Sequence, residues 1–392
     1  MSAKGRAGGE REVRSTKHEG AGVGAQGRGF SDEDRVHMAR ALELARRGLT
    51  TTMPNPRVGC VIARAGKVIG EGFTQPAGED HAEIQALKDC AARGASPAGA
   101  TAYVSLEPCS HHGRTPPCVD SLLGAGLARV VAAVGDPNPR VAGEGFRRLR
   151  AAGVQVETGL LADEARELNV GFFARMERGR PWVRVKMAAT LDGRTALADG
   201  RSQWITGGAA RRDGHAWRAR ACAVLTGIGT VLQDDPRLTV RDVGVTRQPV
   251  RVIVDRHART PSAARVFAAG RVWVFAATAP PPDWPAHVET VALADATGKV
   301  DLEAMMRELA RREVNEVHVE AGARLAGALV AAGLADELLV YLAPSLLGDD
   351  ARGMFALPPL ASLEERIRLR IASVDPVGED WRVVARFESG GR

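Results

Sequence analysis

The chain has few cysteines and few aromatic residues, and it has no long apolar run. Its 392 residues include five cysteines, two tyrosines, nine phenylalanines and six tryptophans. An odd number of widely spaced cysteines argues against a disulfide framework. No stretch reaches the roughly 20 apolar residues that a membrane-spanning helix needs, and the N-terminus lacks the apolar core of a secretion signal. We therefore expect a cytoplasmic protein with no membrane partner.

The excess of positive charge is small, and half of it lies at the N-terminus. The net charge is +6, and residues 1–29 contain six Lys or Arg and three Glu. This Gly-rich segment has almost no apolar residues, so residues 1–30 are predicted to form a disordered basic tail. The rest of the chain shows no basic cluster of the kind that binds nucleic acid, and few aromatic side chains for base stacking. A phosphorylated small-molecule substrate and no nucleic-acid partner are therefore expected.

Two short segments together have the composition of a catalytic zinc site. His81 opens the segment His81-Ala82-Glu83, and Cys109 and Cys118 enclose the eight residues Ser-His-His-Gly-Arg-Thr-Pro-Pro. A catalytic zinc takes three protein ligands and leaves its fourth position for water, whereas a structural zinc usually takes four. A helix that begins at His81 would turn the side chains of His81 and Glu83 about 200° apart. Glu83 is therefore predicted to move protons without binding the metal.

This ligand set is that of the zinc-dependent nucleobase deaminases, with one departure. The common pattern ends in Pro-Cys-x-x-Cys, but here eight residues separate the two cysteines. The inserted residues are polar and partly cationic, which suits a loop that contacts a phosphate. From this chemistry we expect His111, Arg114 and Thr115 to hold the phosphate of the substrate.

Helical and strand-like segments alternate along the chain, which predicts an α/β protein. The pattern restarts after Arg178-Gly179-Arg180-Pro181, so a domain boundary is expected there. In the first half we predict strands at 57–63, 67–73, 101–106 and 129–134, and helices from Ser31, from His81, from Cys118 and over 162–178. In the second half we predict strands at 182–188, 222–226, 250–254, 272–276, 315–320, 337–342 and 381–387, and helices at 208–219, 301–312 and 322–332.

The motifs identify a family over the chain from about residue 31 to the C-terminus. They are Pro54-Asn55-Pro56-Arg57-Val58-Gly59, the run from Glu107 to Cys118, the run from Lys186 to Thr195, Ser202-Gln203-Trp204-Ile205-Thr206, the run from Asp234 to Arg241 and Glu320-Ala321-Gly322. With them the chain resembles the bifunctional deaminase/reductases of bacterial riboflavin biosynthesis. The resemblance implies a cytidine-deaminase-like α/β/α sandwich, the zinc-dependent pyrimidine deaminase domain, over residues 31–178. It implies a dihydrofolate-reductase-like α/β domain, the NADPH-dependent reductase, over residues 179–392.

The resemblance also implies roles for residues of the deaminase domain. His81, Cys109 and Cys118 would bind one Zn2+, and Glu83 would shuttle protons. Asn55 would hydrogen-bond the substrate, although an asparagine between two prolines can also be a simple turn residue. The family often forms dimers or tetramers, so a homo-oligomer is expected.

In the reductase domain no Gly-x-Gly-x-x-Gly opens a nucleotide-binding unit, so a standard dinucleotide-binding domain is not indicated. The resemblance instead assigns the NADPH contacts to Ala188, Trp204, Thr230, Asp234, Gly322, Ala323, Arg324, Leu325, Ala326, Gly327 and Ala328. It assigns the substrate contacts to Ser202, Arg218, Leu238, Arg241 and Glu320. Arg218 and Arg241 could each grip a phosphate with two hydrogen bonds. Asp192 and Glu320 are the candidate proton donors for the reduction.

The reactions implied are a deamination followed by a reduction. The substrate 2,5-diamino-6-(5-phosphoribosylamino)pyrimidin-4-one would lose ammonia at ring carbon 2, and hydride from NADPH would then convert the ribosyl group to ribityl. Two alternatives stay open on sequence alone. One is a nucleic-acid-editing zinc deaminase with an appended domain. The other is a structural zinc module joined to a ligand-binding domain, with His111 or His112 as the fourth ligand.

Overall fold

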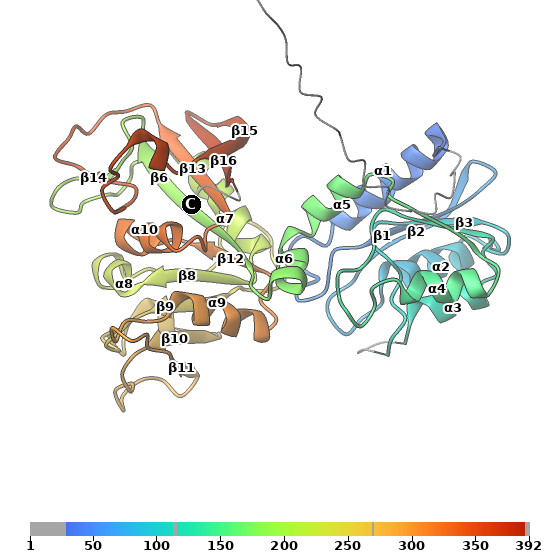
Figure 1. Cartoon of the computed structure of the whole chain (residues 1–392), viewed down its shortest axis with the longest axis horizontal. Coiled ribbons are helices and arrows are strands. Elements are labelled where there is room, and N and C mark those ends of the chain that lie inside the picture. Colours follow the sequence, from blue (N-terminus) through green and yellow to red (C-terminus); the bar gives the residue numbers. More distant parts are fainter. Residues whose placement is uncertain (1–28, 113–115, 269, 389–392) are drawn as a thin grey trace, which may run out of the picture.

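The computed structural model describes residues 29–112, 116–268 and 270–388, and these residues form two large β-sheets. Figure 1 shows the sheets in two lobes, with helix α6 (Val170–Arg178) at the junction. Residues 1–28 of the expected tail, and the phosphate-loop candidates Arg114 and Thr115, lie outside the described residues. The predicted alternation of helices and strands is confirmed.

The first lobe is built on a five-stranded sheet with the order β2-β1-β3-β4-β5. Strand β1 is antiparallel to both of its neighbours, and β3, β4 and β5 are parallel. Because parallel strands end at the same edge of a sheet, the loops that follow β3 and β4 meet there. The strands are β1 (Gly59–Arg64), β2 (Lys67–Phe73), β3 (Thr101–Val104), β4 (Arg129–Ala132) and β5 (Gln155–Thr158).

Helices cover both faces of this sheet and bury an apolar cluster on each face. Helices α1 (Asp32–Arg46) and α5 (Ala162–Leu168) lie on one face, and α2 (Ala82–Ala92), α3 (Cys118–Gly124) and α4 (Glu144–Ala151) lie on the other (Figure 1). The predicted cap at Ser31 is present. Its side chain accepts from the backbone N–H of Asp34, whose carboxylate accepts from the N–H of Ser31. The result is a three-layer α/β/α sandwich.

The single helix predicted over 162–178 is wrong, because it is interrupted at Asn169. Helix α5 ends at Leu168, and α6 begins at Val170. The side chain of Asn169 is turned toward the backbone of Arg57, where Oδ1 accepts from N–H at 2.7 Å and Nδ2 donates to the carbonyl at 2.9 Å. The apolar periodicity of the segment continues through the break, so this long-range contact left no signal in the local pattern.

The second lobe contains a nine-stranded sheet with the order β11-β10-β9-β8-β12-β6-β13-β16-β15. The seven strands from β11 to β13 are parallel, and β16 and β15 complete one edge in antiparallel pairing. The strands are β6 (Trp182–Thr190), β8 (Ala223–Gly227), β9 (Val250–Val254), β10 (Val272–Ala276), β11 (Val288–Ala292), β12 (Glu316–Val319), β13 (Glu337–Ala343), β15 (Leu369–Val377) and β16 (Asp380–Phe387). A separate pair joins β7 (Arg194–Ala196) to β14 (Arg352–Gly353).

Helices also cover both faces of the second sheet. Helices α9 (Leu302–Arg311) and α10 (Ala323–Ala331) pack in the main apolar core, and α7 (Gly208–Arg220) and α8 (Ile228–Asp234) pack against smaller clusters. Every strand predicted in this half is present, whereas β7, β11, β14, β15 and α8 were not predicted. None of the described helices is long and apolar enough to cross a membrane.

Candidate active sites

The three predicted zinc ligands come together at one edge of the first sheet. His81 is the N-cap residue of α2, Cys118 is the first residue of α3, and Cys109 lies in the loop after β3. Two strand-to-helix connections therefore deliver all three side chains. Their ligand atoms lie within 4.8 Å of one another.

The spacing of these atoms fits zinc. His81 Nδ1 is 3.6 Å from the sulfur of Cys109 and 3.3 Å from that of Cys118. A tetrahedral zinc with Zn–N of about 2.05 Å and Zn–S of about 2.3 Å sets nitrogen and sulfur ligands about 3.6 Å apart. Among the described residues, the cluster of possible metal ligands has three members, and neither His111 nor His112 belongs to it. The fourth ligand that a structural zinc module requires is therefore not found among these residues.

The two thiols are arranged to hold a negative charge. The hydrogen bond from Cys118 lowers the pKa of the Cys109 thiol to about 4, with burial acting against it and His81 acting with it. The pKa of Cys118 is raised, first by its hydrogen bond to Cys109 and then by burial. The backbone N–H of Cys118, in the first turn of α3, also donates to the Cys109 sulfur at 3.3 Å. A thiolate is the form of cysteine that binds a metal.

Glu83 lies in the first turn of α2, and it lines the same cavity as His81 and Cys109. Its side chain is buried, with 3% of the residue exposed. Burial, assisted by the charge of Cys109, raises the pKa of Glu83 to about 7. The carboxyl group of Glu83 therefore lies in the cavity with the metal-ligand residues but is not itself one of the three clustered ligands.

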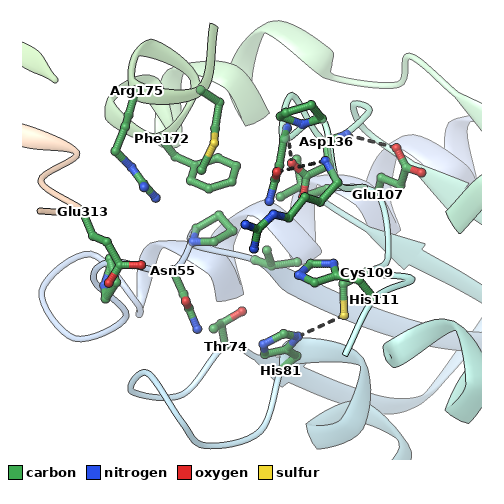
Figure 2. Close-up of a pocket in the computed structure, with 18 of the residues that line it drawn as sticks. Asn55, Thr74, His81, Glu107, Cys109, His111, Asp136, Phe172, Arg175 and Glu313 are labelled. Atoms are coloured by element: carbon green, nitrogen blue, oxygen red, sulfur yellow. Dashed lines mark hydrogen bonds between the residues drawn. The ribbon is translucent and has the colours of Figure 1, made fainter. Parts of the chain in front are cut away.

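The cavity beside this group has a volume of about 930 Å³ and takes its walls from both lobes. Asn55, His81, Cys109 and His111 point into it, and Arg175 of α6 reaches it from another side (Figure 2). The structure thus brings the predicted residues Asn55 and His111 to the metal-ligand group. Arg114 and Thr115 lie outside the described residues.

The cavity also contains polar residues that were not predicted from the sequence. Asp136 and Asn138 follow β4 and line the wall, and burial raises the pKa of Asp136 to about 7. Their loop is held by Glu107, whose carboxylate accepts from the backbone N–H groups of Asp136, Gly143, Gly145 and Phe146. A signal was available, because Pro137-Asn138-Pro139 repeats the Pro-Asn-Pro of the segment that carries Asn55.

A second cavity, of about 640 Å³, lies at the carboxyl ends of β6, β8 and β12. Ligands commonly bind at this edge of a parallel sheet. Nine of the residues predicted for the reductase site line it: Ala188, Ser202, Trp204, Arg218, Thr230, Asp234, Leu238, Arg241 and Glu320. These residues are spread over 133 positions of the sequence, from 188 to 320, and the fold gathers them in one place.

Two kinds of charged group occur in the second cavity: an ion pair between Arg218 and Glu320, and a group of arginines around Arg241. Arg218 donates to both carboxylate oxygens of Glu320, with Nη2 to Oε2 at 2.7 Å, and to the Thr239 carbonyl. Arg241 is exposed and belongs to a group of guanidiniums with Arg237 and Arg265 in the same cavity. Partial desolvation of its guanidinium among these residues lowers the pKa of Arg241, and its arginine neighbours lower the pKa further. Such a concentration of positive charge is suited to a phosphate.

The remaining predicted cofactor residues lie at the N-cap and along the length of α10. Gly322 is the N-cap of α10, and a Cβ on it would lie 4.0 Å from the hydroxyl of Thr230. Gly322, Ala323, Arg324, Leu325, Ala326, Gly327 and Ala328 are not among the residues that line the cavity itself. Ala326 is buried in the main core, and a Cβ on Gly327 would lie 2.3 Å from the carbonyl of Ala356. Trp204, by contrast, is 70% exposed, and the guanidinium of Arg211 lies over its ring, 4.6 Å from the ring centroid.

The two candidate proton donors differ in position, because Glu320 lines the second cavity and Asp192 does not. Asp192 accepts from the backbone N–H groups of Leu347 and Gly348, so it ties two loops together and does not line the cavity. Although burial works in the opposite direction, Arg218 holds the pKa of Glu320 well below its usual range, so Glu320 is a carboxylate. Lys186 on β6 lines the cavity, and burial lowers the pKa of its ammonium group, with Glu320 acting against this. This lysine was not predicted from the sequence.

Two family models match the chain, one in each lobe. Residues 31–134 match the cytidine and deoxycytidylate deaminase zinc-binding region, and residues 181–383 match the RibD C-terminal domain. The second match argues against a nucleic-acid-editing zinc deaminase with an appended domain. The predicted fold class, a deaminase-like domain followed by a reductase-like domain, is confirmed.

Similar proteins cover nearly the whole chain. The riboflavin biosynthesis protein RibD of Escherichia coli (strain K12) is 48% identical over 361 residues, which are 89% of this chain and 98% of that protein. The solved structure of Acinetobacter baumannii RibD has a TM-score of 0.84 at 41% identity, covering 91% of this chain and 99% of that one. The diaminohydroxyphosphoribosylaminopyrimidine deaminase/5-amino-6-(5-phosphoribosylamino)uracil reductase of Thermotoga maritima has a TM-score of 0.83 at 35% identity, with the same coverage. The chain therefore belongs to the RibD family of bifunctional deaminase/reductases of riboflavin biosynthesis.

Proposed function

We propose that the first cavity is the deaminase site and that His81, Cys109 and Cys118 hold its zinc. The observation that carries this proposal is the spacing of the three ligand atoms, which matches tetrahedral zinc, with Glu83 beside them. A zinc ion in such a site lowers the pKa of water and supplies a nucleophile at neutral pH. Asn55 orients the pyrimidine in this cavity, and His111 contacts the phosphate of the substrate.

Glu83 performs the proton transfers of the deamination. It takes a proton from the attacking water, delivers it to the ring nitrogen next to carbon 2, and passes a second proton to the departing amino group. The C–N bond at carbon 2 breaks, a C=O bond replaces it, and ammonia leaves. The substrate is 2,5-diamino-6-(5-phosphoribosylamino)pyrimidin-4-one. Burial of Glu83 keeps bulk water away from these transfers.

We propose that the second cavity is the reductase site and that NADPH is its nicotinamide cofactor. NADPH supplies the hydride that converts the ribosyl group to ribityl. The exposed ring of Trp204 and the end of α10 at Gly322 bind the cofactor, and Arg241 with its neighbouring arginines binds a phosphate. Lys186 is the proton donor that this geometry favours over Asp192 and Glu320, because it is the lysine among the residues that line the cavity and burial lowers the pKa of its ammonium group.

The limits of the domains and the assembly state are part of the same proposal. Deaminase and reductase domains over residues 31–178 and 179–392 are supported by the end of α6 at Arg178 and the start of β6 at Trp182. A homo-oligomer is supported by the edge strand β15, which exposes Ile371 and Val374, since such edges pair with other chains. Free cysteines and zinc-binding thiols suit the reducing cytoplasm.

Mass spectrometry of the pyrimidine product tests both activities. Replacement of NH by O adds about 1 Da, and the two hydrogens of the reduction bring the gain to about 3 Da. Zinc-loaded enzyme should therefore give a gain of about 1 Da without NADPH and about 3 Da with NADPH. A gain of only about 1 Da with NADPH present would refute the reductase proposal, and no change would refute the deaminase proposal.

A further inference from the structure

The deaminase cavity is not closed by the deaminase domain alone. Arg307 and Arg311 of α9 and Glu313 of the turn that follows contribute to its wall, and all three belong to the second lobe. Figure 2 shows Glu313 and Arg175 facing the side of the cavity where Asn55 lies. The second lobe therefore shapes the space around a proposed substrate-binding residue.

Asn315, immediately before β12, touches two walls of this cavity with one side chain. Its Nδ2 donates to the carbonyl of Pro54 at 2.8 Å, and its Oδ1 accepts from Nε of Arg175 at 2.6 Å. Asn315 is 1% exposed. Both ends of the amide are thus used, one on the loop that carries Asn55 and one on a cavity-lining guanidinium.

Arg57 anchors the other end of the same loop. Its side chain is 2% exposed, and Nη1 donates to Glu316 Oε1 at 2.7 Å and to the Leu168 carbonyl at 2.8 Å. Asn169 holds the backbone of Arg57 through two further hydrogen bonds. The short segment that contains Asn55 is therefore tied at Pro54 and at Arg57, on both sides of the proposed substrate contact, to two consecutive residues of the second lobe.

The contact between the lobes is also tight where α6 crosses the start of β12. A Cβ on Gly171 would lie 2.4 Å from Cγ of Glu316 and 2.6 Å from the carbonyl oxygen of Asn315. Real side chains do not approach that closely, so this position on α6 accommodates glycine without displacement. The two anchor residues are consequently held against α6 as well as against the loop.

We propose that Asn315 and Glu316 of the reductase domain are positioning residues for deamination. They hold the segment 54–57 so that Asn55 faces the substrate, and the deaminase site is complete only with the reductase domain in place. A loop fixed before the substrate arrives does not have to be ordered on binding, which favours affinity. This inference rests on the proposed function of Asn55.

Asn315→Asp tests the anchor at Pro54. Aspartate keeps the acceptor for Arg175 but loses the donor to the Pro54 carbonyl. Ammonia release without NADPH should show a deaminase KM raised about tenfold, with kcat changed by less than about threefold. NADPH oxidation with 5-amino-6-(5-phosphoribosylamino)uracil should keep its wild-type kinetics, since Asn315 does not line the reductase cavity.

Arg57→Met tests the second anchor independently. The side chain keeps most of its length, and Glu316 retains Arg184 and Arg220 as partners. The deaminase KM should again rise while the reductase kinetics stay unchanged. Glu167→Gln is the matched control, because it breaks another ion pair between the lobes, that with Arg386, away from the cavity. It should leave both activities at wild-type values.

Three results would overturn the proposal. The first is a wild-type deaminase KM in both anchor variants, and the second is an equal rise of the deaminase KM in Glu167→Gln. The third is a parallel loss of both activities in the anchor variants, which would show that the anchors serve general folding. Asn55→Ala distinguishes a failure of the proposed role of Asn55 from a failure of the proposed anchors. An unchanged KM in Asn55→Ala would refute the role of Asn55 and this proposal with it. A raised KM there, with wild-type KM in the anchor variants, would refute the anchors alone.

Discussion

Replacing Glu316 with glutamine should destabilise the protein strongly at neutral pH. The carboxylate is fully buried and accepts from Arg57 Nη1 at 2.7 Å, from Arg220 Nε at 2.9 Å and from Arg184 Nη1 at 3.2 Å. Glutamine has nearly the same shape, so little packing is lost. It removes the charge, however, and it directs an amide N–H group at a guanidinium.

The size of the effect follows from the burial of the partners. Removing one member of a buried ion pair costs about 3–5 kcal/mol, because the other charge stays buried without compensation. Arg184 keeps Glu337 as a partner, whereas Arg57 keeps only backbone carbonyls. For a domain of this size each kcal/mol lowers Tm by about 2–4 °C, so a fall of about 6–20 °C is expected.

The stability lost in Glu316→Gln should decrease as the pH falls below the unfolded pKa of a glutamate. Burial alone would raise the pKa of Glu316, but Arg220, Arg57 and Arg184 together hold it well below its usual range. A carboxylate with a lowered pKa in the folded state contributes stability that is present above its unfolded pKa of about 4.3 and is lost as pH falls through the folded value. The difference between wild type and Glu316→Gln should therefore be full at pH 7 and smaller below about pH 4.

Thermal unfolding, monitored by circular dichroism at several pH values, measures this difference in stability between wild type and Glu316→Gln. Wild type, Glu316→Gln and Glu167→Gln are compared at each pH, so that effects of acid common to all three cancel. Glu167→Gln breaks an exposed pair and should stay within about 0.5 kcal/mol of wild type. A loss below about 1 kcal/mol at pH 7 for Glu316→Gln, or a loss that grows as pH falls, would refute the reasoning.

Three further predictions concern the two sites. Glu83→Gln should keep stoichiometric zinc and lose deamination by at least about a hundredfold, as expected for loss of a proton-transfer group; turnover near the wild-type rate would contradict its role. Cys118→Ser should lose zinc in a metal assay, and a variant that keeps one zinc per chain would contradict the ligand assignment. Arg241→Ala should raise the reductase KM by about ten- to a hundredfold, because a charged hydrogen bond to phosphate is removed. Ammonia release should be spared in that variant, and loss of both activities would show that Arg241 acts through folding.

Much of the local structure could be predicted because its causes are local. Ser31 with Asp34 marks a helix start through a capping box, and His81 and Cys118 were placed correctly at the beginnings of helices. Strands composed mostly of β-branched and aromatic apolar residues, such as β9 and β10, were also found. The edge strand β15 was missed because an irregular pairing between Ile371 and Ser373, and the Asp375-Pro376 pair, interrupt the alternation of apolar and polar residues.

The break at Asn169 shows the limit of local patterns. The apolar periodicity runs through residues 162–178, yet the helix is divided because Asn169 bonds to the backbone of Arg57, which is 112 residues away in the chain. Lys186 was missed for a related reason. A lysine in a strand gives no sign of whether it faces solvent or a cavity until the neighbouring strands are in place.

The sequence by itself determined the chemistry that this protein can carry. A histidine, two cysteines and a nearby glutamate are identifiable by type and spacing, because metal coordination and proton transfer depend on those functional groups. Only the tertiary structure decided which distant residues share a cavity. It pairs Arg218 with Glu320, and it sets Asn315 and Glu316 of one lobe against the Asn55 loop of the other. Such contacts arise from the packing of sheets and helices far apart in the chain, and no local pattern of residues encodes them.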